Sequence, residues 1–127
     1  MDINFKEFNS FNIAQQQDIM KMGWILFQNE LSIKTSEFND SYVILDETNI
    51  IGMINFNIHD GKVAYIYHFE VLIKRQGYGT ACISKLKNNL KNKVEEIITD
   101  SKDEISHNFW LSQGFIECSD DLVFYFK

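Results

Sequence analysis

HFEVLIKRQGYGTACISKLK, residues 68–87, carries the clearest structural signal in the chain. An apolar, strand-like run reaches a basic pair, Lys74 and Arg75, and then two glycines one residue apart precede a helix-like stretch. Gly77 and Gly79 keep Cβ atoms away from the backbone N–H groups, so a ligand can approach them closely. A helix that begins there adds unpaired N–H groups and the positive end of its dipole. The turn therefore suits a phosphate or pyrophosphate, although the same glycines could serve only to join a strand to a helix.

Two familiar phosphate-binding motifs do not fit this turn. A Walker loop requires G-x-x-x-x-G-K-[ST], which the stretch lacks. The dinucleotide fingerprint requires a third glycine where this chain has Cys82, and it usually belongs to a repeated parallel strand–helix pattern. Thr80 can still cap the helix or donate its hydroxyl to a phosphate oxygen.

Outward from this turn, the apolar pattern predicts a mixed α/β domain over residues 1–127. Strands are expected at 3–8, 41–47, 50–58, 62–72, 94–100, 115–118 and 122–126. Helices are expected at 10–31 (kinked at Gly23 or split in two), 79–91 and 103–113. Asp60-Gly61 marks a tight turn, and Ile105, Phe109 and Trp110 are expected to point inward. The order of elements predicts a mostly antiparallel central sheet with helices on both faces.

Composition limits the possible functions. The 127 residues are 45% hydrophobic and carry a net charge of −6, which is ordinary for a soluble globular protein and disfavours nucleic acid as a partner. No apolar stretch could span a membrane and the start does not resemble a signal peptide, so a cytoplasmic protein without a membrane partner is expected. Cys82, Cys118 and the three histidines show no metal-ligand spacing, so no metal is expected.

The central turn resembles the acetyl-CoA-binding core of the GNAT N-acetyltransferase superfamily. That family's motif is Q/R-x-x-G-x-G/A, and KRQGYG at 74–79 matches it except that Lys74 replaces the first Gln or Arg. HNFWLSQGF at 107–115 is similar to the family's late helix, which ends in F-Y-x-x-x-G-F, with Trp110 in place of the tyrosine. The predicted order of elements agrees with the GNAT acyl-CoA N-acyltransferase fold along nearly the whole chain.

This resemblance implies an N-acetyltransferase that moves an acetyl group from acetyl-CoA to a primary amine of a small molecule, a peptide or a protein. It implies that the pantetheine arm pairs with the backbone of Phe69, Glu70 and Val71. It also implies that the pyrophosphate rests on the turn, which comprises Lys74, Arg75, Gln76, Gly77, Tyr78, Gly79 and Thr80. The family's members are often dimers, so a monomer and a homodimer are both open.

The catalytic groups are less evident. The family's tyrosine donates a proton to the coenzyme A thiolate, whereas the indole of Trp110 can only donate a hydrogen bond. Tyr65, Tyr67 or water could replace it, or the thiolate could leave without a proton, since a thiol has a pKa of about 8.5. A third possibility is a catalytically weak module that binds acetyl-CoA or a protein partner.

No carboxylate stands where the family often has a glutamate on the central strand, near Val63 or Tyr65. Tyr65 and Tyr67 share one face of the strand with Phe69, and this aromatic row is either a core face or a wall of the acceptor pocket. Glu70 has the opposite parity, so it faces away from them.

Overall fold

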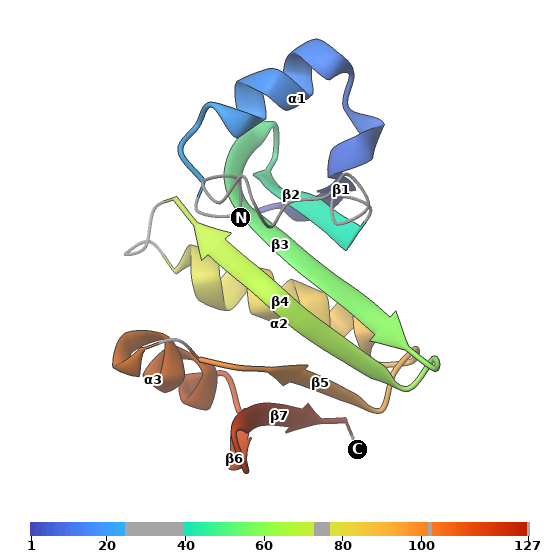
Figure 1. Cartoon of the computed structure of the whole chain (residues 1–127), viewed down its shortest axis with the longest axis vertical. Coiled ribbons are helices and arrows are strands. Elements are labelled where there is room, and N and C mark those ends of the chain that lie inside the picture. The colour runs from blue at the N-terminus through green and yellow to red at the C-terminus, as the bar shows by residue number, and fades with distance from the viewer. Residues whose placement is uncertain (25–39, 73–76, 102, 127) are drawn as a thin grey trace. The chain divides into compact units, whose positions relative to one another are not determined.

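The computed structural model describes residues 1–24, 40–72, 77–101 and 103–126 (Figure 1). Seven strands form one mixed sheet in the order β1-β2-β3-β4-β5-β7-β6. The strands are β1 Ile3–Glu7, β2 Ser41–Asp46, β3 Asn49–His59, β4 Val63–Val71, β5 Glu96–Thr99, β6 Ile116–Cys118 and β7 Asp121–Tyr125. The helices are α1 Ile13–Met20, α2 Tyr78–Leu90 and α3 Glu104–Ser112, with a short 3-10 turn, η1, at Phe8–Ser10. The predicted mixed α/β fold is therefore confirmed.

The strands and two of the helices agree with the sequence prediction to within a few residues. The helix expected over 10–31 is observed as α1, which begins after a reciprocal cap in which Asn12 Oδ1 accepts from the Gln15 N–H at 2.8 Å. Residues 25–39, which include the rest of that prediction, lie outside the described residues. The predicted turn at Asp60-Gly61 is confirmed, and both residues have positive φ.

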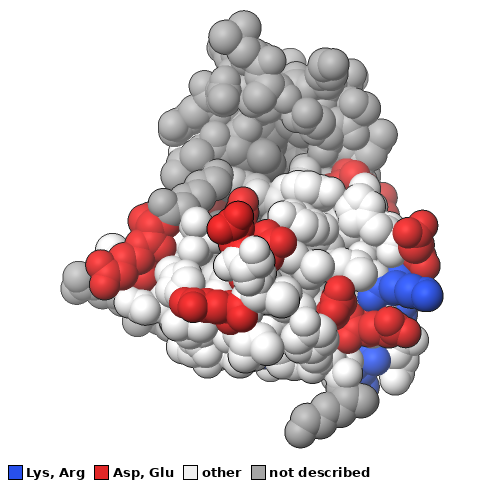
Figure 2. Space-filling view, turned by 60° about the horizontal axis from the view of Figure 1, so that its bottom comes forward, with Lys and Arg blue, Asp and Glu red and all other residues white. Residues whose placement is uncertain are grey.

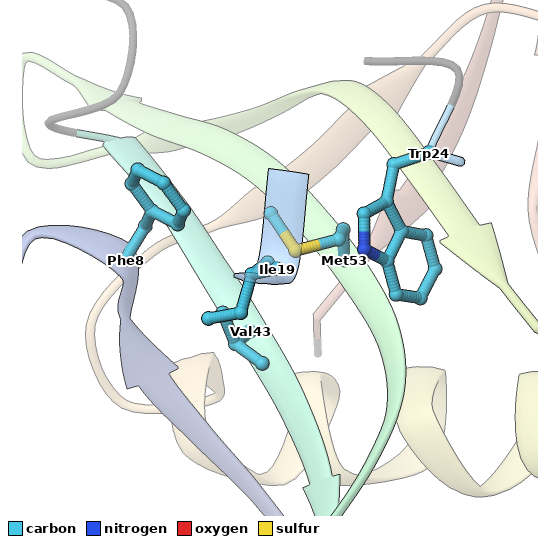
Figure 3. Packing of buried hydrophobic residues seen from close by; sticks show 5 residues of the cluster. All are labelled: Phe8, Ile19, Trp24, Val43 and Met53. Atoms are coloured by element: carbon cyan, nitrogen blue, oxygen red, sulfur yellow. The ribbon is translucent and has the colours of Figure 1, made fainter. Parts of the chain in front are cut away.

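The chain divides into two compact units, and β3 and β4 contribute residues to both. The first unit contains Met1–Asn55 and His68–Tyr78. Its strands β1, β2 and β3 pair antiparallel, so this part of the sheet is a meander. The core of this unit consists of Phe8, Ile19, Trp24, Val43 and Met53, whose side chains lie together in Figure 3.

The second unit contains Phe56–Tyr67 and Gly79–Lys127. Its buried residues come from alternate positions of β4 and β5, from two successive positions of β7 and from one face each of α2 and α3. They include Ala64, Ile66, Ile97, Leu122, Ile83, Leu86 and Trp110. The prediction that Ile105 points inward is wrong, because its side chain is 84% exposed. Ile105 and the buried Trp110 are five residues apart, which places them about 140° apart around a helix.

Lys87 of α2 joins three elements of the second unit. Its Nζ donates a hydrogen bond to the Gln113 carbonyl at the end of α3, and it lies 4.0 Å from the centre of the Phe124 ring. The carbonyl lies at the C-terminal end of α3. The partial negative charge of a helix C-terminus favours a cation there. Burial lowers the pKa of Lys87 from its ordinary value. The contact positions α3 against α2 and β7.

Gly52 permits the close approach of β3 to β4. A Cβ atom at this position would lie 2.7 Å from the Glu70 carbonyl oxygen, so Gly52→Ala should lower the free energy of unfolding by about 3 kcal/mol. Gly61→Ala is the control. Its Cβ would meet no atom within 4 Å, but its φ of +67° makes alanine cost about 1 kcal/mol. Urea unfolding of both variants measures the difference, and equal losses would contradict the close approach.

Candidate functional site

The parallel pairing of β4 with β5 is short. It joins Val63–Tyr65 to Glu96–Ile98, and β5 ends one residue later, whereas β4 continues to Val71. Where the pairing ends, the Thr99 hydroxyl donates to the Ile66 carbonyl at 3.2 Å. We call this place, just beyond Tyr65 and Ile98, the fork.

Strand register brings two carboxylates to the fork. Ile98 pairs with Tyr65 on one side and with Val123 of β7 on the other, so these three side chains share one face of the sheet. Asp100 follows Ile98 by two residues, and Asp121 precedes Val123 by two. Because side chains alternate between faces with a period of two, both carboxylates are expected on the Tyr65 face.

Interactions of Tyr65 support this placement. Its hydroxyl forms a hydrogen bond with the Asp121 carboxylate. Burial, followed by the negative charges of Asp121 and Asp100, raises the pKa of Tyr65 above its ordinary value. Tyr65 therefore keeps its proton at neutral pH, and the two carboxylates are close enough for their charges to act on it.

Tyr67 continues the aromatic row on the same face. Its ring stacks on that of Tyr65 with centroids 4.9 Å apart, and its side chain is 49% exposed. Its hydroxyl lies 2.9 Å from Nε2 of His59, the last residue of β3. The face is thus an accessible surface of paired polar aromatics at this point, and the interpretation of Tyr65 and Tyr67 as core residues is not supported.

The structure brings to these tyrosines three residues that the sequence interpretation did not assign to a site: His59, Asp100 and Asp121. His59 directly precedes the predicted turn at Asp60-Gly61. That hairpin signal does not say which side chain of the next strand His59 contacts. Assigning Asp100 and Asp121 to the site would have required the register between β5 and β7. That register depends on residues that are distant in sequence.

The predicted phosphate turn is described from Gly77 onward, and Lys74, Arg75 and Gln76 lie outside the described residues. Gly77 has a φ of +74°, which favours glycine, and α2 begins at the next residue. Tyr78, between the two glycines, donates its hydroxyl to Asp46 Oδ2 at 3.1 Å.

Gly79 and Thr80 form the first turn of α2. A Cβ atom on Gly79 would lie 3.0 Å from Cε1 of Phe109, so this glycine also permits the packing of α2 against α3. Thr80 is exposed, and its Oγ1 accepts a hydrogen bond from Gln113 Nε2 at 3.1 Å. Its position in the first turn of a 13-residue helix suits an anionic ligand.

Phe69, Glu70 and Val71 are the last three residues of β4 and lie within the strand predicted at 62–72. The Glu70 carboxylate lies 3.0 Å from His68 Nε2, so these two polar side chains pair with each other. Their parity places them on the face of β4 opposite to Tyr65 and Tyr67.

Trp110 is a packing residue. It is 4% exposed and lies between Phe109 and Phe115, with ring centroids at 5.2 Å and 5.0 Å. Its aromatic contacts explain why a large, flat side chain stands at this point of α3.

Charge on the described surface is mainly acidic. Figure 2 shows one face on which Asp and Glu side chains stand in several groups, while Lys and Arg lie toward one side of the view. Among the described residues, no group of three or more His, Cys, Asp or Glu side chains could hold a metal ion. No helix in the described part of the chain is both long and apolar enough to cross a membrane.

Comparison with known proteins gives a family and a set of similar folds. The sequence model of the acetyltransferase (GNAT) family matches residues 6–115. No curated protein matches the chain.

Several solved structures have a similar fold. GCN5 of Tetrahymena superposes with a TM-score of 0.74 at 19% identity, covering 100% of this chain and 97% of that one. The N-acetyltransferase PseH of Campylobacter jejuni in complex with acetyl coenzyme A gives 0.65 at 18% identity, covering 98% of both chains. The PaiA N-acetyltransferase of Thermoplasma acidophilum in complex with coenzyme A gives 0.63 at 11% identity, covering 97% of both.

The contact between Tyr65 and Asp121 can be tested by titration. Tyr65 should ionise above its ordinary pKa of 10.0, and Asp121→Asn should lower that pKa because it removes a negative charge. The difference in tyrosinate absorbance between the parent protein and Tyr65→Phe isolates this one group. Asp120→Asn, in the exposed turn beside it, is the control. An unchanged titration of Tyr65 in Asp121→Asn would contradict the contact.

Proposed function

Because the chain belongs to the GNAT acetyltransferase family, we propose that it transfers the acetyl group of acetyl-CoA to a primary amine of a small molecule or a peptide. The observation that carries the proposal is the fork, since β4 continues beyond its pairing with β5. An extended ligand can add to the edge of a sheet by forming hydrogen bonds with the backbone of a strand. A pantetheine arm, with its two amide groups, is such a ligand.

The pantetheine arm and the pyrophosphate of acetyl-CoA would bind to different parts of the chain. The backbone of Phe69, Glu70 and Val71 would pair with the pantetheine arm. The turn formed by Lys74, Arg75, Gln76, Gly77, Tyr78, Gly79 and Thr80 would hold the pyrophosphate. Two observations support this assignment: the positive φ of Gly77 and the position of Thr80 in the first turn of α2.

The reaction needs one bond to form and one to break. The lone pair of the amine nitrogen attacks the thioester carbonyl carbon, the carbon–sulfur bond breaks, and the coenzyme A thiolate departs while the nitrogen loses a proton. His59 and Tyr67 offer a route for that proton: the amine gives it to the Tyr67 oxygen as the Tyr67 proton passes to Nε2 of His59.

We infer that α3 supplies no acid to the thiolate. Trp110 is buried in its aromatic contacts and is a poor acid in any case. Burial and two nearby carboxylates raise the pKa of Tyr65, so its phenol releases a proton less readily than an ordinary tyrosine does. We infer that the thiolate leaves unprotonated or takes a proton from water, and that Tyr65 orients the acceptor.

Trp110 also favours a second candidate, an acetyl-CoA-binding module with weak catalysis. Its burial leaves the late helix without the acid that the family uses. Binding of acetyl-CoA without turnover of any amine would favour this candidate over the enzyme.

Isothermal titration tests the cofactor assignment. Acetyl-CoA should bind at micromolar concentration and more tightly than adenosine diphosphate, because only acetyl-CoA can use the edge of β4. Thr80→Glu should weaken both ligands at least about tenfold, because a carboxylate in the first turn competes with the phosphates while helix stability is retained. Ser84→Glu, exposed one turn later on α2, is the matched control. Unchanged affinity in a folded Thr80→Glu variant would exclude this turn as the phosphate site.

Removal of one hydroxyl tests the proton route. Tyr67→Phe should lower kcat at least about tenfold while acetyl-CoA affinity stays unchanged, and His59→Gln should have a similar effect. The double variant should be no worse than either single one, because both residues serve one route. Tyr125→Phe, an equally exposed tyrosine of β7, is the control. Additive losses would show that His59 and Tyr67 act separately.

A further inference from the structure

Ser101, His107 and Glu117 form a hydrogen-bonded cluster in the second unit that acetyl transfer does not use. We propose that this cluster hydrolyses esters of small carboxylic acids, an activity beyond acetyl transfer. Ser101 is the nucleophile, His107 is the general base, and Glu117 is the positioning residue that orients the base.

Two contacts join the three side chains. Ser101 Oγ lies 3.1 Å from His107 Nδ1, and Glu117 Oε1 lies 2.5 Å from His107 Nε2. A serine becomes a nucleophile when a base lies within hydrogen-bond reach and a third group orients that base. Both distances meet this requirement.

The contact with Glu117 decides which ring nitrogen of His107 carries the proton. An ionised carboxylate only accepts hydrogen bonds, so Nε2 of His107 donates to Glu117. In the neutral imidazole, Nδ1 then carries the lone pair and accepts from the Ser101 hydroxyl. The Ser101 proton is therefore directed at a base, and its oxygen can attack a carbonyl carbon.

Three elements hold the cluster. Ser101 lies two residues after the end of β5, His107 lies in α3, and Glu117 is the middle residue of β6. α3 begins at a reciprocal cap in which Asp103 Oδ1 accepts from the Ser106 N–H at 2.7 Å, and β6 is paired with β7. The backbone that carries the base and the backbone that carries its partner are therefore both fixed by hydrogen bonds.

The cluster is accessible to a substrate. Ser101 is half-buried, and the side chains of His107 and Glu117 are 31% and 64% exposed. Because Glu117 is mostly in solvent, its charge is screened, and its main effect should be to orient His107. Asp100 and Glu104, close in sequence, are exposed carboxylates, so an uncharged ester is a more suitable substrate than an anionic one.

Hydrolysis would proceed in two balanced steps. In the first, Ser101 Oγ attacks the ester carbonyl carbon and its proton passes to His107 Nδ1; the carbon–oxygen bond then breaks, and the alcohol leaves with that proton. In the second, water attacks the acyl-serine and gives a proton to His107, which returns it to Ser101 as the carboxylic acid departs. N–H groups in the first turn of α3, which have no intrahelical partners, would stabilise the oxyanion.

The leaving group favours esters over thioesters. An alkoxide is a poor leaving group until it is protonated, and the imidazolium of His107 supplies that proton. A thiolate leaves more easily, because a thiol has a pKa of about 8.5. The acid in this cluster therefore contributes most to the cleavage of an ester.

Hydrolysis of para-nitrophenyl acetate by the purified protein, without acetyl-CoA, tests the proposal. Ser101→Ala should lower the rate at least about tenfold, because the nucleophile is lost. Ser84→Ala, at an exposed serine of α2, is the matched control and should retain the parent rate. A fluorophosphonate, which reacts with activated serines, should label Ser101 in the parent protein, as located by mass spectrometry of its peptides.

Glu117 is tested as a positioning residue. Glu117→Gln should lower kcat about threefold and leave KM unchanged, because the amide still accepts from Nε2 but does not stabilise the imidazolium. Glu117→Asp keeps the charge and should recover part of the loss. A slower rate in Glu117→Asp than in Glu117→Gln would mean that the length of the side chain matters and its charge does not, and so would remove Glu117 from the proposal.

Equal rates in the parent protein and Ser101→Ala would overturn the proposal, because other side chains would then cleave the ester. Absence of the fluorophosphonate label, or a label on another residue, would also overturn it. Circular dichroism verifies that each variant is folded, and acetyl-CoA affinity is measured separately on the same samples. Loss of ester hydrolysis is thus distinguishable from unfolding and from failure of the proposed acetyl transfer.

Discussion

The brief parallel ladder between β4 and β5 is the constraint on which the arrangement of the site depends. Three residues of β4 pair with β5 before the two strands part, and the Thr99 hydroxyl completes the last contact by donating to the Ile66 carbonyl. A longer ladder would occupy the edge of β4 with protein hydrogen bonds. A shorter one would leave β5 and β7 without a register on β4, and the side chains of Tyr65 and Asp121 would not meet.

The register of β4 with β5 gives the two faces of β4 different roles. Residues of even parity, Ala64 and Ile66, are buried in the second unit, whereas Tyr65 and Tyr67 carry hydroxyls to the opposite face. Packing of the buried face therefore fixes the position of the strand, and the hydroxyl groups on the opposite face can take part in a reaction. Trp110 belongs to the packing side, where it contributes volume and aromatic contacts.

Much of this fold could be predicted from local signals. The strands, the turn at Asp60-Gly61 and the glycine turn before α2 follow from alternation, turn residues and apolar spacing. Ile105 was assigned wrongly because a nine-residue helix leaves much of its surface exposed, and composition alone does not say which face packs. The partners of the two tyrosines could not be predicted. The hairpin signal does not specify the contact of His59 with Tyr67. The contact of Asp121 depends on a pairing between β5 and β7 across more than twenty residues of sequence.

The hydrogen bond from Tyr78 to Asp46 has a consequence for the speed and strength of ligand capture. Tyr78 stands between Gly77 and Gly79, where backbone freedom in the unbound state would be large. Anchoring its side chain to the end of β2 restricts that freedom before any ligand arrives. The turn is then preorganised, and less conformational entropy is lost when a ligand binds. This preorganisation should slow the dissociation of the ligand more than it speeds the association.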